Sequence, residues 1–234
     1  MAVAIRTVRP STLRTLWSST IGKKAVMAVT GVVMLLFLVV HMYGNLKIFF
    51  GAAAFDDYAA WMRTIGEPVL HHSWYLWIQR VVLVLCVVLH AVSAWQLSRR
   101  DIRARRTGYQ HAQPSGPSFA TRTMRWGGII LALFIVWHIL DLTTGTVNPL
   151  GEAGHPYENV VADFRNWWAD VIYIVAMCAL GLHIRHGFWS AAQTLGANGQ
   201  RSGPIFKTAS WVLAVVLWAG FVTIPVAVMT GAVS

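Results

Sequence analysis

Residues 25–43 read AVMAVTGVVMLLFLVVHMY, a stretch with no charged side chain and a single histidine near its end. A helix needs about 20 mostly apolar residues to cross the hydrocarbon core of a bilayer. The stretch therefore predicts a membrane-spanning helix. Lys23 and Lys24 stand directly before it, as expected where a chain enters the membrane from its basic side.

Four further apolar segments of similar length follow along the chain. We predict membrane spans at about 24–43, 75–97, 126–146, 168–187 and 208–230. The chain is 56% hydrophobic and 12% charged, whereas soluble domains carry about 25% charged residues. Only a helix satisfies its backbone groups within one lipid-facing segment. The predicted fold class is all-α: residues 1–234 form one integral membrane bundle of five transmembrane helices.

The segments between these spans contain helix-breaking residues. Loops 98–124, 147–167 and 188–207 hold proline and glycine, and we expect them to be irregular. The breakers of the first of these loops are Pro114, Gly116 and Pro117. Loop 44–74 is richer in apolar and aromatic residues, so we expect a short interfacial helix there.

The distribution of positive charge predicts the orientation. Fifteen of the 19 Lys and Arg residues lie in the N-terminal segment and near loops 98–124 and 188–207, on one side of the predicted bundle. Positive loops face the cytoplasm, so the N-terminus is expected there, in a multi-pass membrane protein. The net charge of +10 is then explained by topology and contact with anionic lipid, without nucleic acid.

One histidine falls inside each of the first four predicted spans. These are His41, His90, His138 and His183. An ionisable side chain inside a membrane is costly, so each is a candidate functional residue. A single membrane histidine is more often a packing or hydrogen-bonding residue, but one in each of four helices favours a shared role. The loop histidines are expected at the surface: His71, His72, His111 and His155.

The depths of the four histidines sort them into two pairs. At 1.5 Å per residue, His41 lies about 27 Å and His138 about 20 Å from the inner boundary, in the outer half of the membrane. On the same scale, His90 and His183 lie about 24 Å and 22 Å from the outer ends of their helices, in the inner half.

Pairing by depth is what bis-histidine haem ligation requires. Metal–imidazole bonds of about 2 Å place two ligating nitrogens about 4 Å apart across one porphyrin. The pattern predicts two stacked b-type haems, one held by His41 and His138 and one by His90 and His183. Zinc is less favoured, because neither depth offers a carboxylate or thiol to complete a four-ligand site.

Two neighbours of His183 leave alternatives open. His186 lies three residues later on the same helix face, so it is an alternative ligand, although its place at the inner boundary better suits a haem propionate. Arg185 is either a propionate contact or an ordinary basic residue of the cytoplasmic side.

Two motifs resemble those of a known family. Residues 22–31 (GKKAVMAVTG) with 41–46 (HMYGNL), and residues 183–190 (HIRHGFWS), are similar to motifs in the first and fourth helices of the cytochrome b-558 family. This family comprises the five-helix, di-haem cytochrome b subunits of succinate dehydrogenase and some fumarate reductases. In the family's fourth-helix motif the first histidine is the haem ligand, which favours His183 over His186.

The resemblance implies a membrane anchor of succinate:quinone oxidoreductase. A flavoprotein with FAD and an iron–sulfur subunit would dock on the basic face, and succinate oxidation would take place on the flavoprotein. The haems would connect these partners to a membrane quinone, usually menaquinone, in the respiratory chain. His90 and His183 would then hold the haem nearer the iron–sulfur subunit. Some fumarate-reducing relatives carry a glutamate two residues before the fourth-helix ligand, where this chain has Gly181.

A quinone site would need an apolar slot, hydrogen-bond donors and a proton donor. Near the outer haem we expect Glu67 and Asp141, the latter three residues after His138 and on the same helix face. Each residue also has an alternative interpretation that involves no quinone. Glu67 is then a solvated loop acid, and Asp141 is then the ion-pair partner of Arg80 or Lys47. These two cations are also candidates to hold the outer haem's propionates.

Two other function classes stay open at this point. A stand-alone di-haem carrier, similar to a cytochrome b561 reductase, would use the same depth-paired histidines without soluble partners. A transporter or structural membrane protein would leave the histidines without metal, although the sequence has no repeats or broken helices to favour it. A haem spectrum separates the last class from the others, and copurification of a flavoprotein separates the first two.

Overall fold

The computed structural model describes residues 17–104 and 119–234, and within this part the chain is helical with no β-strand. Five long helices dominate: α2 (Thr20–Asn45), α4 (Trp74–Ala104), α5 (Phe119–His138), α7 (Trp167–Thr194) and α8 (Ser202–Met229). A 3₁₀ turn, η1 (Leu46–Phe50), continues α2, and a π-helical turn, η2 (Ile139–Thr143), continues α5. All five are long and apolar enough to cross a membrane, which confirms the predicted spans.

The helix ends follow from local sequence. The Ser19 hydroxyl caps α2 by accepting a hydrogen bond from the Gly22 N–H at 2.9 Å. The helix α7 stops at Gly196, whose φ of +76° suits a residue without a Cβ. Pro204 lies in the first turn of α8, where its missing N–H costs no helical hydrogen bond.

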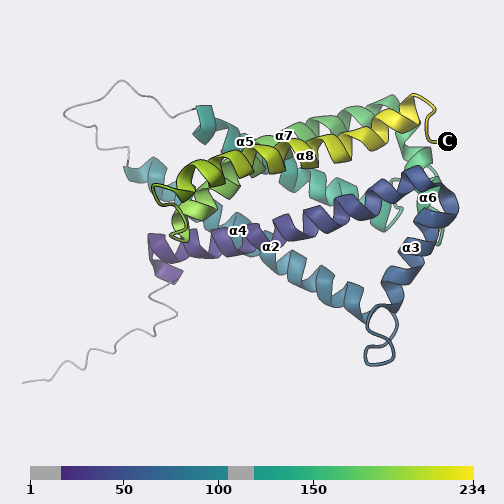
Figure 1. Cartoon of the computed structure of the whole chain (residues 1–234), viewed down its shortest axis with the longest axis horizontal. Helices are drawn as coiled ribbons and strands as arrows, with labels where there is room; N and C mark the ends of the chain where they lie inside the picture. The colour runs from purple at the N-terminus through teal and green to yellow at the C-terminus, as the bar shows by residue number, and fades with distance from the viewer. Residues whose placement is uncertain (1–16, 105–118) are drawn as a thin grey trace, which may run out of the picture.

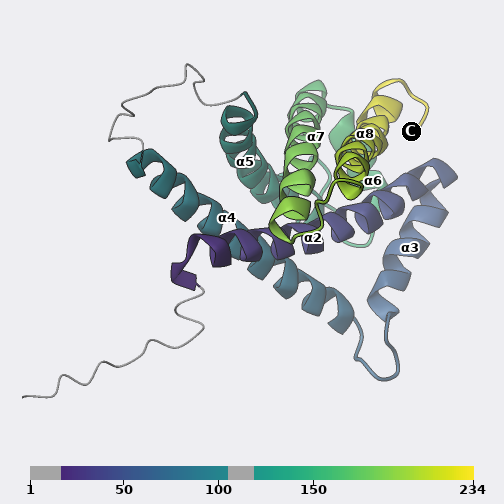
Figure 2. The same cartoon turned by 60° about the vertical axis from the view of Figure 1, so that its left-hand side comes forward.

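The bundle has two groups of helices: α5, α7 and α8 form one group, and α2 and α4 form the other. In the first group, α7 lies between α5 and α8. It packs against α8, α5 and α2. The helix α4 crosses α2 and packs on it, but forms no extended contact with α5, α7 or α8. Figure 1 shows α5, α7 and α8 side by side above α2 and α4, and Figure 2 shows α4 diverging from α5.

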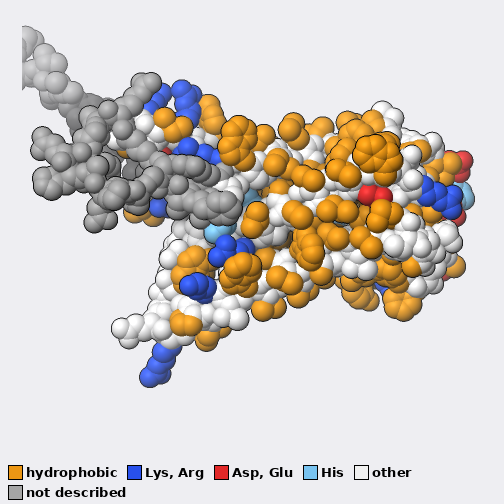
Figure 3. All heavy atoms as spheres, turned by 90° about the horizontal axis from the view of Figure 1, so that it is seen from above, with side chains coloured by type: hydrophobic (Ala, Val, Ile, Leu, Met, Phe, Trp, Pro, Cys, Tyr) orange, Lys and Arg blue, Asp and Glu red, His pale blue; other side chains and the backbone are white. Residues whose placement is uncertain are grey.

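The two ends of the bundle differ in charge. We call one end the basic end: it contains the starts of α2, α5 and α8 and the ends of α4 and α7. We call the other end the acidic end, where two short helices lie: α3 (Ala52–Thr64) and α6 (Pro156–Phe164). In the space-filling view, apolar side chains cover the length between the ends, and the visible carboxylates lie toward the acidic end (Figure 3).

The connections agree only in part with expectation. The helix α3 confirms the short helix expected in loop 44–74. The prediction of an irregular loop at 147–167 is wrong, because α6 forms there with Pro156 at its first position, where proline is well tolerated. Loop 98–124 is shorter than predicted, since α4 continues to Ala104 and α5 starts at Phe119. His111 and the breakers of that loop lie outside the described residues.

The main apolar core lies at the acidic end. Ile48 of η1, Phe55 of α3, Phe164 of α6 and Tyr173 of α7 are buried there together with the last turn of α8. A smaller core joins α7 and α8 nearer the middle of the bundle, around Leu217. The acidic end is therefore held rigidly around the residues described next.

Candidate functional site

The structure brings the four span histidines together as two pairs. The ring centroids of His41 on α2 and His138 on α5 lie 5.8 Å apart, with the rings nearly perpendicular. The centroids of His90 on α4 and His183 on α7 lie 6.1 Å apart. These are the same pairs that the depths in the sequence predict, with the His41–His138 pair toward the acidic end.

The spacing within each pair fits a metal placed between two imidazoles. Two metal–nitrogen bonds of about 2 Å, plus roughly 1 Å from each nitrogen to its ring centre, give a centroid separation of about 6 Å. Among the described residues, no group of three or more His, Cys, Asp or Glu side chains is arranged to hold a metal ion. Each pair therefore offers two imidazole groups, with no third protein ligand among the described residues.

His138 is anchored through its Nδ1 atom. Nδ1 lies 3.2 Å from the Tyr173 hydroxyl oxygen, and the Tyr173 hydroxyl donates to Asp141 Oδ2 at 2.6 Å. Because the tyrosine proton is engaged with the carboxylate, the tyrosine oxygen accepts from the Nδ1–H of His138. This assignment leaves the lone pair on Nε2 available to a metal.

Asp141 is almost completely buried, with 1% of its surface exposed. Its other oxygen accepts a hydrogen bond from Asn148 Nδ2 at 3.0 Å. It lies in the π-helical turn η2 directly after His138, and such turns occur often at functional sites. Asn148 is held in turn by the backbone N–H groups of Leu150 and Gly151, which donate to its Oδ1.

His90 is anchored in a different way. Its Nδ1 lies 3.0 Å from the carbonyl oxygen of Met27 and 3.3 Å from the Thr30 hydroxyl on α2. The hydroxyl itself donates to the Val26 carbonyl at 2.7 Å. Nδ1 of His90 therefore carries the proton, and Nε2 is again the atom available to a metal.

Gly31 makes room for this ring. A Cβ atom added at Gly31 would lie 3.4 Å from Cε1 of His90. A larger side chain at this position would occupy the space that the imidazole fills. This glycine belongs to the first-helix motif noted above, and the structure gives a steric reason for its small size.

The second histidine of each pair has an apolar setting. His41 stacks on Phe37 with ring centroids 5.1 Å apart and contacts Phe221 of α8. Nδ1 of His183 is buried and has no hydrogen-bond partner in the described part of the chain. A buried polar nitrogen without a partner costs free energy, and a bound group would offer one way to offset this cost.

Two more aspartates are buried beside Asp141. Asp163 on α6 is 0% exposed and Asp170 on α7 is 3% exposed, and their carboxylate oxygens have no hydrogen-bond donor among the described residues. Burial, together with the neighbouring carboxylate of Asp141, raises the pKa of Asp163 to about 8. Asp163 is therefore mostly protonated at neutral pH.

The polar residues around His138 were only partly predictable. Sequence reasoning found Asp141 but missed Tyr173, Asn148 and Asp163. Asn148 and Asp163 lie in the segment expected to be an irregular loop. The signal for Tyr173 was its position ten residues before His183 on the same helix, but this spacing did not by itself indicate which neighbour it contacts.

The remaining predicted residues lie at the ends of the bundle. Glu67 is exposed and lies 3.2 Å from Nδ1 of His72. Lys47 lies over the rings of Tyr43 and Tyr58, and Arg80 lies over Trp77. Neither cation forms an ion pair with Asp141, which bonds to Tyr173 and Asn148 instead.

At the basic end, the Arg185 guanidinium stacks on Trp211 of α8 at 4.0 Å and lies 3.4 Å from Nε2 of His186. Two residues along a helix turn it by about 200°, so Arg185 emerges on the opposite side of α7 from His183. Its expected role as a propionate contact stays a prediction.

Comparisons with protein-family models, with curated proteins and with solved structures gave no match to this chain. A functional interpretation therefore rests on the geometry of the two histidine pairs and on the motifs quoted above.

Proposed function

We propose that the chain is the membrane-anchor cytochrome b subunit of a succinate:quinone oxidoreductase, with two b-type haems and menaquinone as its quinone. The observation that supports this most directly is the pair of histidine–histidine separations, 5.8 Å and 6.1 Å, each between two different membrane-length helices. Each haem, when bound, supplies a one-electron carrier inside the bilayer.

The chain's own residues would prepare both sites. Hydrogen bonds at Nδ1 orient His90 and His138, so that each ring presents Nε2 to the metal. Phe37 and Phe221 exclude water from His41. The helix α4 forms no extended contact with α5 or α7, so a porphyrin held by His90 and His183 would lie between two helices that do not pack on each other.

The proposed orientation places the basic end in the cytoplasm, where a flavoprotein and an iron–sulfur subunit would dock. The support is the charge asymmetry of the sequence, read by the positive-inside rule. The His90–His183 pair would then be the one nearer the iron–sulfur subunit. In a bacterium, this location is the cell (inner) membrane.

Quinone chemistry would take place at the acidic end, and it requires groups that hold and release protons. Glu67 is exposed there and is accessible to water. The neighbouring Asp163 is mostly protonated at neutral pH, so it would release a proton and take one up again, while Asp141 accepts hydrogen bonds from Tyr173 and Asn148. We propose Glu67 and the Asp141–Asp163 pair as the proton-holding groups of this end.

The test is a reduced-minus-oxidised visible spectrum of the purified membrane complex, with haem quantified per chain and the accompanying subunits identified. We expect two b haems together with a flavoprotein and an iron–sulfur protein. Two haems without partners would instead establish a stand-alone carrier of the cytochrome b561 kind. A folded preparation without haem would refute both functions.

A further inference from the structure

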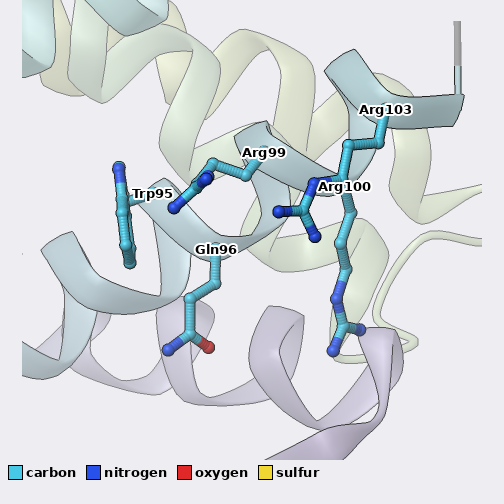
Figure 4. Close-up of a pocket in the computed structure, with 5 residues that line it drawn as sticks. All are labelled: Trp95, Gln96, Arg99, Arg100 and Arg103. Carbon is cyan, nitrogen blue, oxygen red and sulfur yellow. The ribbon is translucent and has the colours of Figure 1, made fainter. Parts of the chain in front are cut away.

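A basic pocket lies at the end of α4, away from both histidine pairs. Trp95, Gln96, Arg99, Arg100 and Arg103 line an open groove of about 210 Å³ on the surface of α4. Figure 4 shows Arg99 and Arg103 extending back along α4, with Arg99 beside the ring of Trp95, while Arg100 and Gln96 point toward α2. Three guanidinium groups therefore gather within about two turns of one helix.

One of the three arginines already has partners. Arg100 donates hydrogen bonds to the Ser18 carbonyl at 2.8 Å and to the Thr20 hydroxyl at 3.2 Å, so it ties the end of α4 to the start of α2. Arg99 lies over the ring of Trp95 at 5.0 Å. No described carboxylate forms an ion pair with Arg99 or Arg103. Both guanidinium groups are therefore available to bind an anion.

The depth of the pocket points to a lipid. The hydrocarbon core is about 30 Å thick, and the bilayer is about 40–45 Å thick with its headgroups. Counted at 1.5 Å per residue from Trp77 near the other end of α4, Trp95 lies about 27 Å away, Arg99 about 33 Å and Arg103 about 39 Å. Trp95 thus lies at about the edge of the hydrocarbon, Arg99 lies in the headgroup layer, and Arg103 lies just beyond it, within reach of the phosphates through its long side chain.

Trp95 also faces outward. Its side chain is 58% exposed in the protein alone, and tryptophan favours the membrane–water interface. Basic pockets at this level bind anionic headgroups, and an arginine fork matches phosphate oxygens. A docking surface for a soluble subunit would not need a tryptophan at the lipid boundary beside the cations.

We propose that this pocket binds the phosphate of an anionic membrane lipid, such as phosphatidylglycerol, in the leaflet at the basic end. Arg99 and Arg103 hold the phosphate, Trp95 contacts the upper acyl chain, and Arg100 positions α4. The proposal does not depend on haem or on the proposed function, because none of these residues contacts the histidine pairs.

The test is a lipid titration of the purified full-length protein, with its copurifying subunits, followed by native mass spectrometry. The probes are phosphatidylglycerol, phosphatidylcholine and inorganic phosphate as a competitor. The variant is Arg99→Gln/Arg103→Gln, which leaves Arg100 in place. The matched control is Arg63→Gln, because Arg63 is an exposed arginine near the acidic end whose guanidinium donates to the Ala59 carbonyl.

We expect the double variant to bind phosphatidylglycerol about thirtyfold more weakly, since each basic side chain near the surface contributes about fivefold. Phosphatidylcholine binding should not change, and the Arg63→Gln control should bind phosphatidylglycerol as the original protein does. The variant Arg99→Lys/Arg103→Lys, which keeps both charges, should stay within about fivefold of the original protein, so a loss in the Gln variant alone is not a folding defect.

Competition by inorganic phosphate distinguishes the two sources of the anion. Lack of displacement at millimolar phosphate would assign the pocket to a lipid headgroup, whereas full displacement would assign it to free phosphate and overturn the lipid assignment. Equal phosphatidylglycerol binding by the Gln variant and the original protein would overturn the proposal. Loss of a soluble subunit with unchanged lipid binding would overturn it too, in favour of a protein-docking surface.

Discussion

The two histidine pairs have similar spacing but different surroundings. His138 is connected through Tyr173 to the buried carboxylate of Asp141, whereas His90 donates to a neutral carbonyl on α2. The pair toward the acidic end is enclosed by aromatic rings and by the larger apolar core. In the pair toward the basic end, the small size of Gly31 leaves room for the His90 ring, and the packing of α4 on α2 holds that ring in place.

This difference implies that the two sites tune a bound metal by different means. A carboxylate behind an imidazole makes that ligand more basic, and a more basic ligand stabilises the oxidised metal. A backbone carbonyl orients the ring with a weaker electrostatic effect. We therefore expect the site near the acidic end to respond to changes in its hydrogen bonds, and the other site to respond to changes in packing.

The largest expected effect comes from removing one proposed haem ligand at a time. His138→Ala and His41→Ala should each lower the haem content from two to one per chain and should abolish the same spectral component. His90→Ala and His183→Ala should abolish the other component. Haem quantification and low-temperature difference spectra measure this, with His155→Ala, an exposed loop histidine, as the control. Loss of both haems in every variant would contradict two independent sites.

The next effect concerns packing at the His90–His183 pair. Gly31→Leu would place carbon atoms where the His90 ring lies, since even a Cβ would stand 3.4 Å from Cε1. We expect this variant to lose most of the haem of that pair and to keep the other haem, while Gly31→Ala keeps both. Gly128→Leu on α5 is the matched control, because a Cβ there meets no atom within 4 Å. Equal haem loss in the control would show that bulk alone is harmful.

A smaller effect is expected at the Tyr173 hydroxyl. Tyr173→Phe removes the link between His138 and Asp141, and loss of such outer partners costs about 10–100-fold in metal affinity. We expect the midpoint potential of one haem to rise by tens of millivolts, because a tenfold difference in affinity between oxidation states is about 59 mV for one electron. A spectroelectrochemical titration measures this. Tyr157→Phe, which loses only an exposed hydrogen bond, should leave both potentials unchanged.

The spans and the histidine pairing were predictable because both depend on one-dimensional properties. Hydropathy and length determine where a helix crosses the bilayer, and a constant rise per residue converts sequence position into depth. His41 and His138, 97 positions apart in sequence, could be paired on depth alone. The helix α6 was missed because its nine residues are too short for a span and are preceded by Pro and Gly.

The surroundings of the histidines were less predictable, because they depend on how helices rotate about their own axes. Depth places Tyr173 near His138, but only packing of α5 against α7 decides that its hydroxyl contacts that ring. Asp141 was expected near a quinone site, and the competing interpretation paired it with Lys47 or Arg80. Its burial instead favours neutral partners that are themselves fixed, Tyr173 and Asn148.

The last prediction concerns stability and not the histidine pairs, and it is the pH dependence that Asp163 gives to stability. Burial and the Asp141 carboxylate raise the pKa of Asp163 to about 8, well above that of an aspartate in an unfolded chain. Between pH 4 and 8 the folded protein therefore holds one proton more than the unfolded chain. Stability falls as pH rises through this range, by at most about 1.4 kcal/mol per pH unit, and it levels off above pH 8.

Asp163→Asn cannot ionise, and we expect it to raise the melting temperature at pH 8 and to flatten the decline in stability between pH 5 and 8. Thermal unfolding in detergent across this range measures both, with the exposed Glu152→Gln as control. An unchanged slope in Asp163→Asn would show that Asp163 does not hold the extra proton, and would leave Asp141 and Asp170, the other carboxylates that face it, as the groups to change next.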